Sequence, residues 1–145
     1  MHIFIQTLFL YMGEGSNDIV IRRRYSAFIY CASTYLERLS VPRRYLGHIY
    51  LLNILTNIYI AKKFNSALLD KFYLDTATKF ETTVERVKRR VDVCIEKVWD
   101  EAHSAEKRAI VEGIVSDEYS VPSRLVFIRG VMRNIMEEDL YSEED

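Results

Sequence analysis

Apolar residues recur along most of this chain in steps of three and four, the spacing that places side chains on one side of an α-helix. The pattern runs from residue 17 to residue 39, where the Ser-Val-Pro at 40–42 interrupts it. Residues 43–60 are apolar on nearly all sides, which is typical of a helix buried at the centre of a domain. Shorter patterns predict further helices at residues 66–71, 73–80, 83–102, 105–112 and 122–138.

The pattern therefore predicts an all-α, single-domain fold of about six helices. A chain of 145 residues, of which 49% are hydrophobic, can bury one core of ordinary size. Only 5 Gly and 2 Pro interrupt it. We divide the chain into an apolar N-terminal arm (residues 1–16), a helical domain (17–138) and an acidic tail (139–145).

The N-terminal arm begins with MHIFIQTLFLYM, a run that is too short to span a bilayer and lacks the basic start of a secretory signal. It predicts either a short strand or an arm that packs on the domain, and we expect no membrane partner. Cys31 and Cys94 each lie among apolar neighbours at helical spacing, which indicates reduced core thiols. We therefore expect a cytoplasmic protein.

Candidate catalytic and metal-binding chemistry is sparse. His2, His48 and His103 are scattered, without Cys, His or carboxylate partners at the spacing of metal ligands. We therefore predict no metal site and no cofactor. The sequence offers no Ser-His-Asp arrangement, no nucleophile motif and no carboxylate pair at an apolar mouth, so we do not expect an enzyme.

The distribution of charge changes this picture. The formal net charge is only −1, but residues 41–99 carry eleven Lys and Arg against six Asp and Glu, whereas residues 100–145 carry five against twelve. A basic middle segment is a candidate surface for a polyanion. Arg43 and Arg44 stand at the start of the central helix, where the helix dipole disfavours cations. For this pair, ligand contact and plain solvation remain equally open.

The helix predicted at 83–102 concentrates the positive charge. Its core side, read at the helical period, consists of Val84, Val87, Val91, Ile95 and Val98. Arg86 and Arg89 lie opposite, with Arg90 on one flank and Lys88 near the other edge. The preceding Thr82-Thr83-Val84-Glu85 has the capping-box pattern, in which the Thr82 hydroxyl accepts from the N–H of Glu85.

A short helix, a tight turn and a second helix with outward arginines form the arrangement of a helix-turn-helix. In that motif the second helix lies in the DNA major groove and reads base edges with its N-terminal residues. An amphipathic helix with a solvated basic side has the same pattern. The residues alone leave both interpretations open.

Four segments resemble the C-terminal DNA-binding effector domain of the stage-zero sporulation master response regulator, a sporulation initiation factor. They are VPRRYLGHIYLL from Val41, FYLDTATKFETT from Phe72, RVKRRVDVCIEKVW from Arg86 and VPSRLVFIRGV from Val121. The first three stand in one ungapped register, so the resemblance is specific although each segment alone is not.

The resemblance implies a six-helix domain with an embedded helix-turn-helix, regulation of transcription, and double-stranded DNA as the partner. Arg86 and Arg89 match arginines of the family's recognition helix, and Arg89 matches the one expected to reach a guanine. A contact of residues 102–115 with the RNA polymerase sigma factor is also implied, and a homodimer is compatible with it. The predicted DNA-binding residues are Thr82, Thr83, Glu85, Arg86, Lys88, Arg89, Arg90 and Lys79.

Three departures from the family stand out. Lys88 occupies a glutamate position and Asp92 an arginine position, both expected to face DNA, so the family's preferred DNA sequence need not carry over. Arg90 would supply the phosphate contact that an aspartate at position 92 cannot make. Only 40 residues precede Val41 and they lack the pattern of a receiver domain, so we expect an effector domain without its receiver. The alternative function is a protein-interaction module that antagonises a related regulator or RNA polymerase without reading DNA.

Overall fold

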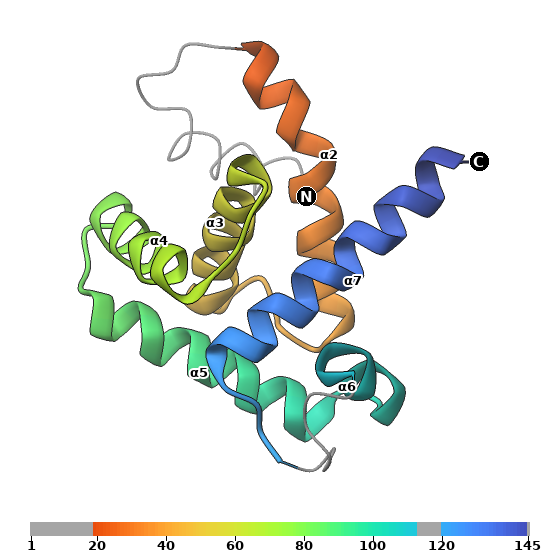
Figure 1. Ribbon diagram of the computed structural model, residues 1–145. Coiled ribbons are helices and arrows are strands. Elements are labelled where there is room, and N and C mark those ends of the chain that lie inside the picture. Colours follow the sequence, from red (N-terminus) through yellow and green to blue (C-terminus); the bar gives the residue numbers. More distant parts are fainter. Residues whose placement is uncertain (1–18, 113–119, 145) are drawn as a thin grey trace.

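The helix at the centre of the molecule, α3 (Leu46–Ala61), is buried along most of its length. The computed structural model describes residues 19–112 and 120–144, with side chains from residue 25 to residue 137 within those ranges. The described residues form six helices and no strand: α2 (Ile19–Arg38), α3, α4 (Ser66–Lys79), α5 (Val84–Glu101), α6 (Ser104–Val111) and α7 (Arg124–Glu144) (Figure 1). The predicted all-α fold is confirmed.

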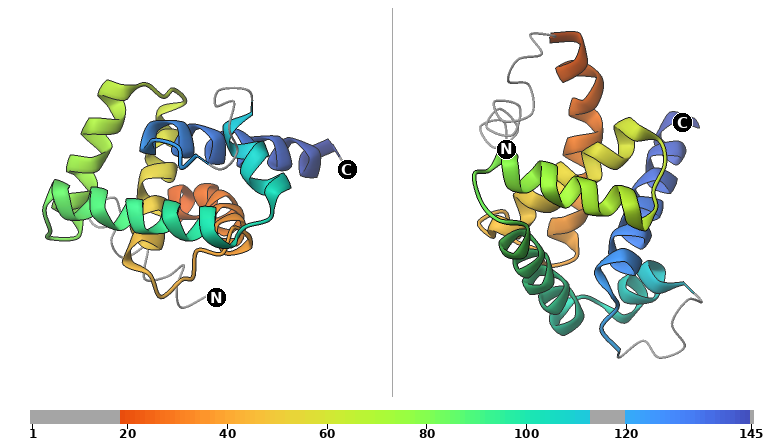
Figure 2. Two further views of the ribbon diagram at one scale, coloured as in Figure 1. Left: turned by 90° about the horizontal axis from the view of Figure 1, so that it is seen from below. Right: turned by 60° about the vertical axis from the view of Figure 1, so that its left-hand side comes forward.

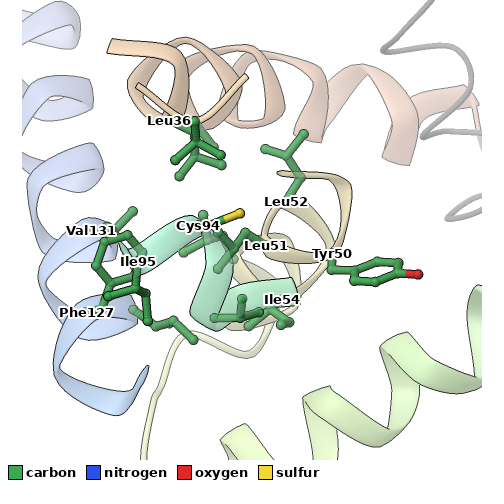
Figure 3. Close-up of a cluster of buried hydrophobic side chains, with 14 of the residues drawn as sticks. Leu36, Tyr50, Leu51, Leu52, Ile54, Cys94, Ile95, Phe127 and Val131 are labelled. Carbon is green, nitrogen blue, oxygen red and sulfur yellow. The ribbon is translucent and has the colours of Figure 1, made fainter. Parts of the chain in front are cut away.

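The hydrophobic core forms around α3 because this helix carries apolar side chains on all sides. Burying one such side chain stabilises the fold by about 1.5–3 kcal/mol, so helices that share this core form one domain. Figure 3 shows α3 side chains converging with others from α2, α5 and α7: Leu51, Leu52 and Ile54 meet Leu36, Cys94, Ile95, Phe127 and Val131, each at most 2% exposed.

The polar side chains that α3 carries into the core all have partners. Asn53 donates to the Thr76 hydroxyl of α4 at 2.8 Å. His48 donates from Nδ1 to the Val41 carbonyl (3.1 Å) and, because a carbonyl only accepts, its neutral Nε2 accepts from the Ser33 hydroxyl of α2 (3.0 Å). Burial lowers the pKa of His48 below its usual value, which favours this neutral form. These bonds fix α3 against α2 and α4.

Two close helix crossings depend on glycine. A Cβ atom at Gly47 of α3 would lie 2.5 Å from the Arg90 carbonyl oxygen of α5 and would overlap the Cys94 sulfur. A Cβ atom at Gly130 of α7 would overlap the backbone of Ile110 in α6. Real side chains do not tolerate such approaches, so the backbones meet here only because no side chain intervenes. The position of α5 is therefore fixed by a backbone contact with α3.

Several predicted helix boundaries differ from the observed ones. Residues 66–71 and 73–80 belong to one helix, α4, because both Phe72 and Tyr73 turn inward and no Gly or Pro separates the two halves. The central helix begins at Leu46 and not at residue 43, since the Tyr45 N–H closes a turn on the Pro42 carbonyl (3.1 Å). The acidic tail begins inside α7, which continues to Glu144. The N-terminal arm lies outside the described residues.

Replacing Gly47 with alanine tests the α3–α5 crossing. In an open helical site this change stabilises a protein by about 0.5–1 kcal/mol. Here the added methyl group would push α5 away from α3, and we expect a loss of about 1–3 kcal/mol in the free energy of unfolding. Urea unfolding followed by circular dichroism measures it.

The exposed Ala67 of α4, changed to Gly, gives the propensity effect alone in the same chain. A gain in stability for Gly47→Ala would show that the crossing is not tight.

Candidate nucleic-acid interface

The turn between α4 and α5 closes one helix and starts the next. The Thr82 N–H bonds to the Ala77 carbonyl at 2.8 Å, and Glu81 has a φ of 54°, in the left-handed region. This combination is a common way for a helix to end. The chain then changes direction, and α5 follows α4 after this turn at one side of the domain (Figure 2). The two helices have the predicted helix-turn-helix arrangement.

The cap of α5 is Thr83, whose hydroxyl oxygen accepts from the Arg86 N–H at 3.2 Å. The predicted capping box on Thr82 and Glu85 is therefore wrong by one residue. The reason is that the Thr82 N–H donates to the Ala77 carbonyl at the end of α4. Thr83 is then the residue at the cap position of α5. Glu85 is exposed in the first turn of α5, where a carboxylate suits the helix dipole.

The inner side of α5 is the one expected from the sequence. Val87, Val91, Ile95 and Val98 are at most 2% exposed, and Val84 is half-buried at the start of the helix. The inward set of valines and the contact at Gly47 both fix the rotation of α5. The opposite side of the helix must therefore face solvent.

Three arginines occupy that outer side: Arg86, Arg89 and Arg90 are all exposed. With the residues that the structure describes, none of their side chains forms a hydrogen bond or an ion pair. They lie within one and a half turns of each other near the helix start. Exposed positive charge at this density favours an anionic partner.

Lys88 lies to one side of these arginines. Its Nζ is 5.4 Å from the centre of the Tyr73 ring of α4, and its side chain is half-buried. Tyr73 is only 2% exposed, and burial raises the pKa of its phenol to about 12. Such a cation–ring contact contributes about 0.5–1 kcal/mol and links the two helices. Lys79, the last residue of α4, is half-buried.

Asp92, placed at a DNA-facing position by the resemblance, is bound to α7. Its carboxylate accepts two hydrogen bonds from Arg124, at 2.8 Å from Nε and at 3.0 Å from Nη2. The hydrogen bonds to Asp92 raise the pKa of Arg124 above its usual value. The aspartate charge is thus paired across two helices. No local pattern predicts this pair, because its partners are 32 residues apart in the chain.

A shallow groove extends the basic surface from α5 to the start of α3. It has a volume of about 260 Å³, and Arg44 of the turn before α3 lines it together with Arg90 and Val93 of α5. Arg44 is exposed, with its guanidinium 5.5 Å from the centre of the Tyr45 ring. Arg43, by contrast, pairs with Glu37 of α2. The structure thus separates two arginines that the sequence could not tell apart.

The segment after α5 packs against α7. Arg133 of α7 donates to the Ala109 and Ile110 carbonyls of α6 at 2.8 Å and 3.1 Å, and also pairs with Glu112. Lys107 donates to the Trp99 carbonyl at 3.2 Å. Of the segment 102–115, residues 113–115 lie outside the described part of the chain. The sigma-factor contact of this segment stays a prediction.

The described residues give little support to other kinds of site. In residues 19–112 and 120–144, no group of three His, Cys, Asp or Glu side chains is placed to hold a metal ion. None of the described helices has both the length and the apolar content to cross a bilayer. Burial raises the pKa of the Cys94 thiol to about 12, so this cysteine stays protonated and unreactive. The basic surface of α5 is therefore the candidate site.

Comparison with known proteins points to one family. A family model described as "Sporulation initiation factor Spo0A C terminal" matches residues 32–135. The match runs from the end of α2 into α7 and includes every residue of the basic surface. No curated protein matches the chain.

The Asp92–Arg124 pair can be tested by a double-mutant cycle with Asp92→Asn and Arg124→Gln. Both side chains are roughly 40% exposed, at 43% and 37%, so solvent screens the attraction. We expect a coupling free energy of about 0.5–1 kcal/mol at low salt that decreases at high salt. Urea unfolding of the four proteins measures it. Additive single effects would show that the pair does not link α5 to α7.

Proposed function

Because the chain belongs to the sporulation initiation factor Spo0A C-terminal family, a family of DNA-binding effector domains, we propose that it reads a specific DNA sequence. In this proposal α5 is the recognition helix and lies in the major groove. The protein bound at its DNA site regulates transcription. The observation that carries the proposal is the set of exposed arginines on the outer side of α5, none of which is paired with a side chain that the structure describes: Arg86, Arg89 and Arg90.

The dimensions of α5 support this placement. A helix with its side chains is about 10–12 Å across and the major groove is about 12 Å wide. Arg86 and Arg89, three residues apart, are separated by about 4.5 Å along the axis, which allows them to reach neighbouring base pairs. Each guanidinium can donate two bonds to O6 and N7 of a guanine, and the Glu85 carboxylate can accept from a cytosine amino group.

Phosphate contacts would set the orientation of α5 in the groove. Thr83 uses its oxygen as a cap acceptor, so its hydroxyl hydrogen can donate to a phosphate at the helix start, beside Thr82. Lys79 is the last residue of α4, on one side of α5, whereas Arg44 and Arg90 line the groove on the α3 side. Cations on both sides of α5 would meet the two strands that border a major groove.

The departures from the family bear differently on this interface. The Asp92 carboxylate is neutralised by Arg124, so it would repel a phosphate less than a free aspartate would. Arg44 and Arg90 supply positive charge next to it. Lys88, held over Tyr73, carries a charge opposite to that of the family's glutamate. We therefore propose that the family's mode of binding is retained and that the preferred sequence differs at the position Lys88 contacts.

Fluorescence anisotropy on two duplexes tests this function. One duplex carries the DNA box of the family and the other a scrambled sequence, each titrated at several salt concentrations. Binding to the box at least about tenfold tighter, or about 1.4 kcal/mol, supports sequence reading with the family's preference. Equal, steeply salt-dependent binding would point to a different target sequence, which selection from a random library would identify. No binding to either duplex at low salt would contradict the proposal.

Arg89→Ala separates base reading from charge. Removing a bidentate guanine contact should weaken binding to the preferred duplex by about 1–3 kcal/mol and should relax specificity. Lys79→Ala, a phosphate-side change, should weaken binding to all duplexes alike. The same anisotropy titrations measure both variants. Equal reductions in affinity on every duplex for Arg89→Ala would contradict its assignment to a base.

Arg44→Ala and Arg90→Ala test the groove between α3 and α5. If each arginine meets one phosphate, each variant should reduce the slope of log K against log salt by about 0.9, and the double variant by about twice that. Arg129→Ala of α7 is a matched control, because its exposed guanidinium lies over the Phe64 ring, 5.7 Å from its centre, and does not line this groove. An unchanged slope for Arg44→Ala would remove this residue from the interface.

A further inference from the structure

A second concave surface lies apart from the basic surface of α5. It is a groove of about 520 Å³ between the first half of α2, the end of α3 and the middle of α7. None of its lining residues belongs to α4 or α5. The lining is mostly apolar but includes the two exposed lysines Lys62 and Lys63. Its volume falls within the range of about 300–1,000 Å³ that is usual for ligand-binding cavities.

Packing inside the domain fixes one wall of this groove. The Tyr59 ring stacks on Phe28 with the ring centres 4.2 Å apart, and Tyr25 meets Tyr59 edge-on at 5.9 Å. These contacts hold the aromatic wall in place before anything binds. The facing wall contains Met132 and Met136 of α7, whose flexible side chains adapt to the shape of an apolar partner.

We propose that the apolar N-terminal arm of the same chain occupies this groove. Most of the first twelve residues, MHIFIQTLFLYM, are large and apolar, and moving such side chains out of water is favourable. An arm of this composition is stabilised when it packs against an apolar surface. The groove offers one next to the helix that directly follows the arm.

The length of chain between arm and groove suits this placement. Tyr25, which lines the groove, lies about 9 Å along α2 from Ile19. The six residues at 13–18, GEGSND, can span up to about 20 Å when extended. They also include two glycines, a serine, an asparagine and an aspartate, the residues that favour chain reversal. The arm can therefore turn back along α2 and reach the groove without strain.

Methionine methyl NMR on the 145-residue chain tests this proposal directly. The sequence has 4 Met: Met1 and Met12 in the arm, and Met132 and Met136 in the groove. Replacing Phe4 and Phe9 with alanine removes two aromatic rings from the arm. We expect the methyl signals of Met132 and Met136 to shift by more than their linewidth, because nearby rings displace such signals. Leu74→Ala, at an exposed position of α4 (57% exposed), is the matched control and should shift neither.

Three results are distinguishable. Shifts of the groove methionines that persist on dilution support docking within one chain. Unchanged signals for Met132 and Met136 would overturn the proposal. Shifts that vanish on dilution would also overturn it, because they would place the arm of a second copy in the groove. DNA binding enters none of these outcomes, so the proposal stands or fails independently of the proposed function.

A change on the groove side gives a second readout. Met136→Lys places a charge in the apolar groove and should release the arm. We expect chymotrypsin to cleave after Phe9 or Tyr11 several-fold faster than in the unchanged chain, with circular dichroism confirming that the helices persist. Leu74→Lys introduces the same charge on exposed α4 and should leave the cleavage rate unchanged. Equal cleavage rates in the Met136→Lys variant and the unchanged chain would contradict the proposal.

Discussion

The arrangement of this domain depends on one contact between two backbones, where Gly47 of α3 meets the carbonyl of Arg90 in α5. Interiors pack densely, so a side chain at this point would separate the helices and leave voids along the contact. The close approach brings the valines of α5 into the core around α3. It also sets which side of α5 faces outward. The core and the proposed DNA-reading surface are thus two results of the same crossing.

The same crossing explains the second basic element. The start of α3 lies against the middle of α5, so the turn before α3 brings Arg44 beside Arg90. On the far side of α5, Asp92 is held by Arg124 of α7 and Lys88 by the ring of Tyr73. The exposed arginines therefore stand on a helix that is supported from three directions. A recognition helix needs such rigidity, because a binding constellation loses affinity when its supports are loose.

The sequence was sufficient for features that repeat along the chain. The spacing of Val87, Val91, Ile95 and Val98 identified the inner side of α5 correctly, because only one rotation of the helix buries all four side chains. It failed where two local solutions compete. Thr82 and Thr83 are equally able to cap a helix, and only the way α4 ends decides between them. Two features depend on helix crossings and cannot be read from a local pattern: the Asp92–Arg124 ion pair and the groove that Arg44 and Arg90 both line.

The glycine contact has a consequence for how this domain can diverge. At the crossing, α5 contributes the carbonyl of residue 90 and not its side chain. This carbonyl belongs to the backbone, so substitutions at positions 86, 89 and 90 that keep the helix also keep this contact. The outward side chains can then be exchanged one at a time at the small cost in stability that is usual for surface positions. The domain separates the part of α5 that must be kept for stability from the part that is free to acquire a new target.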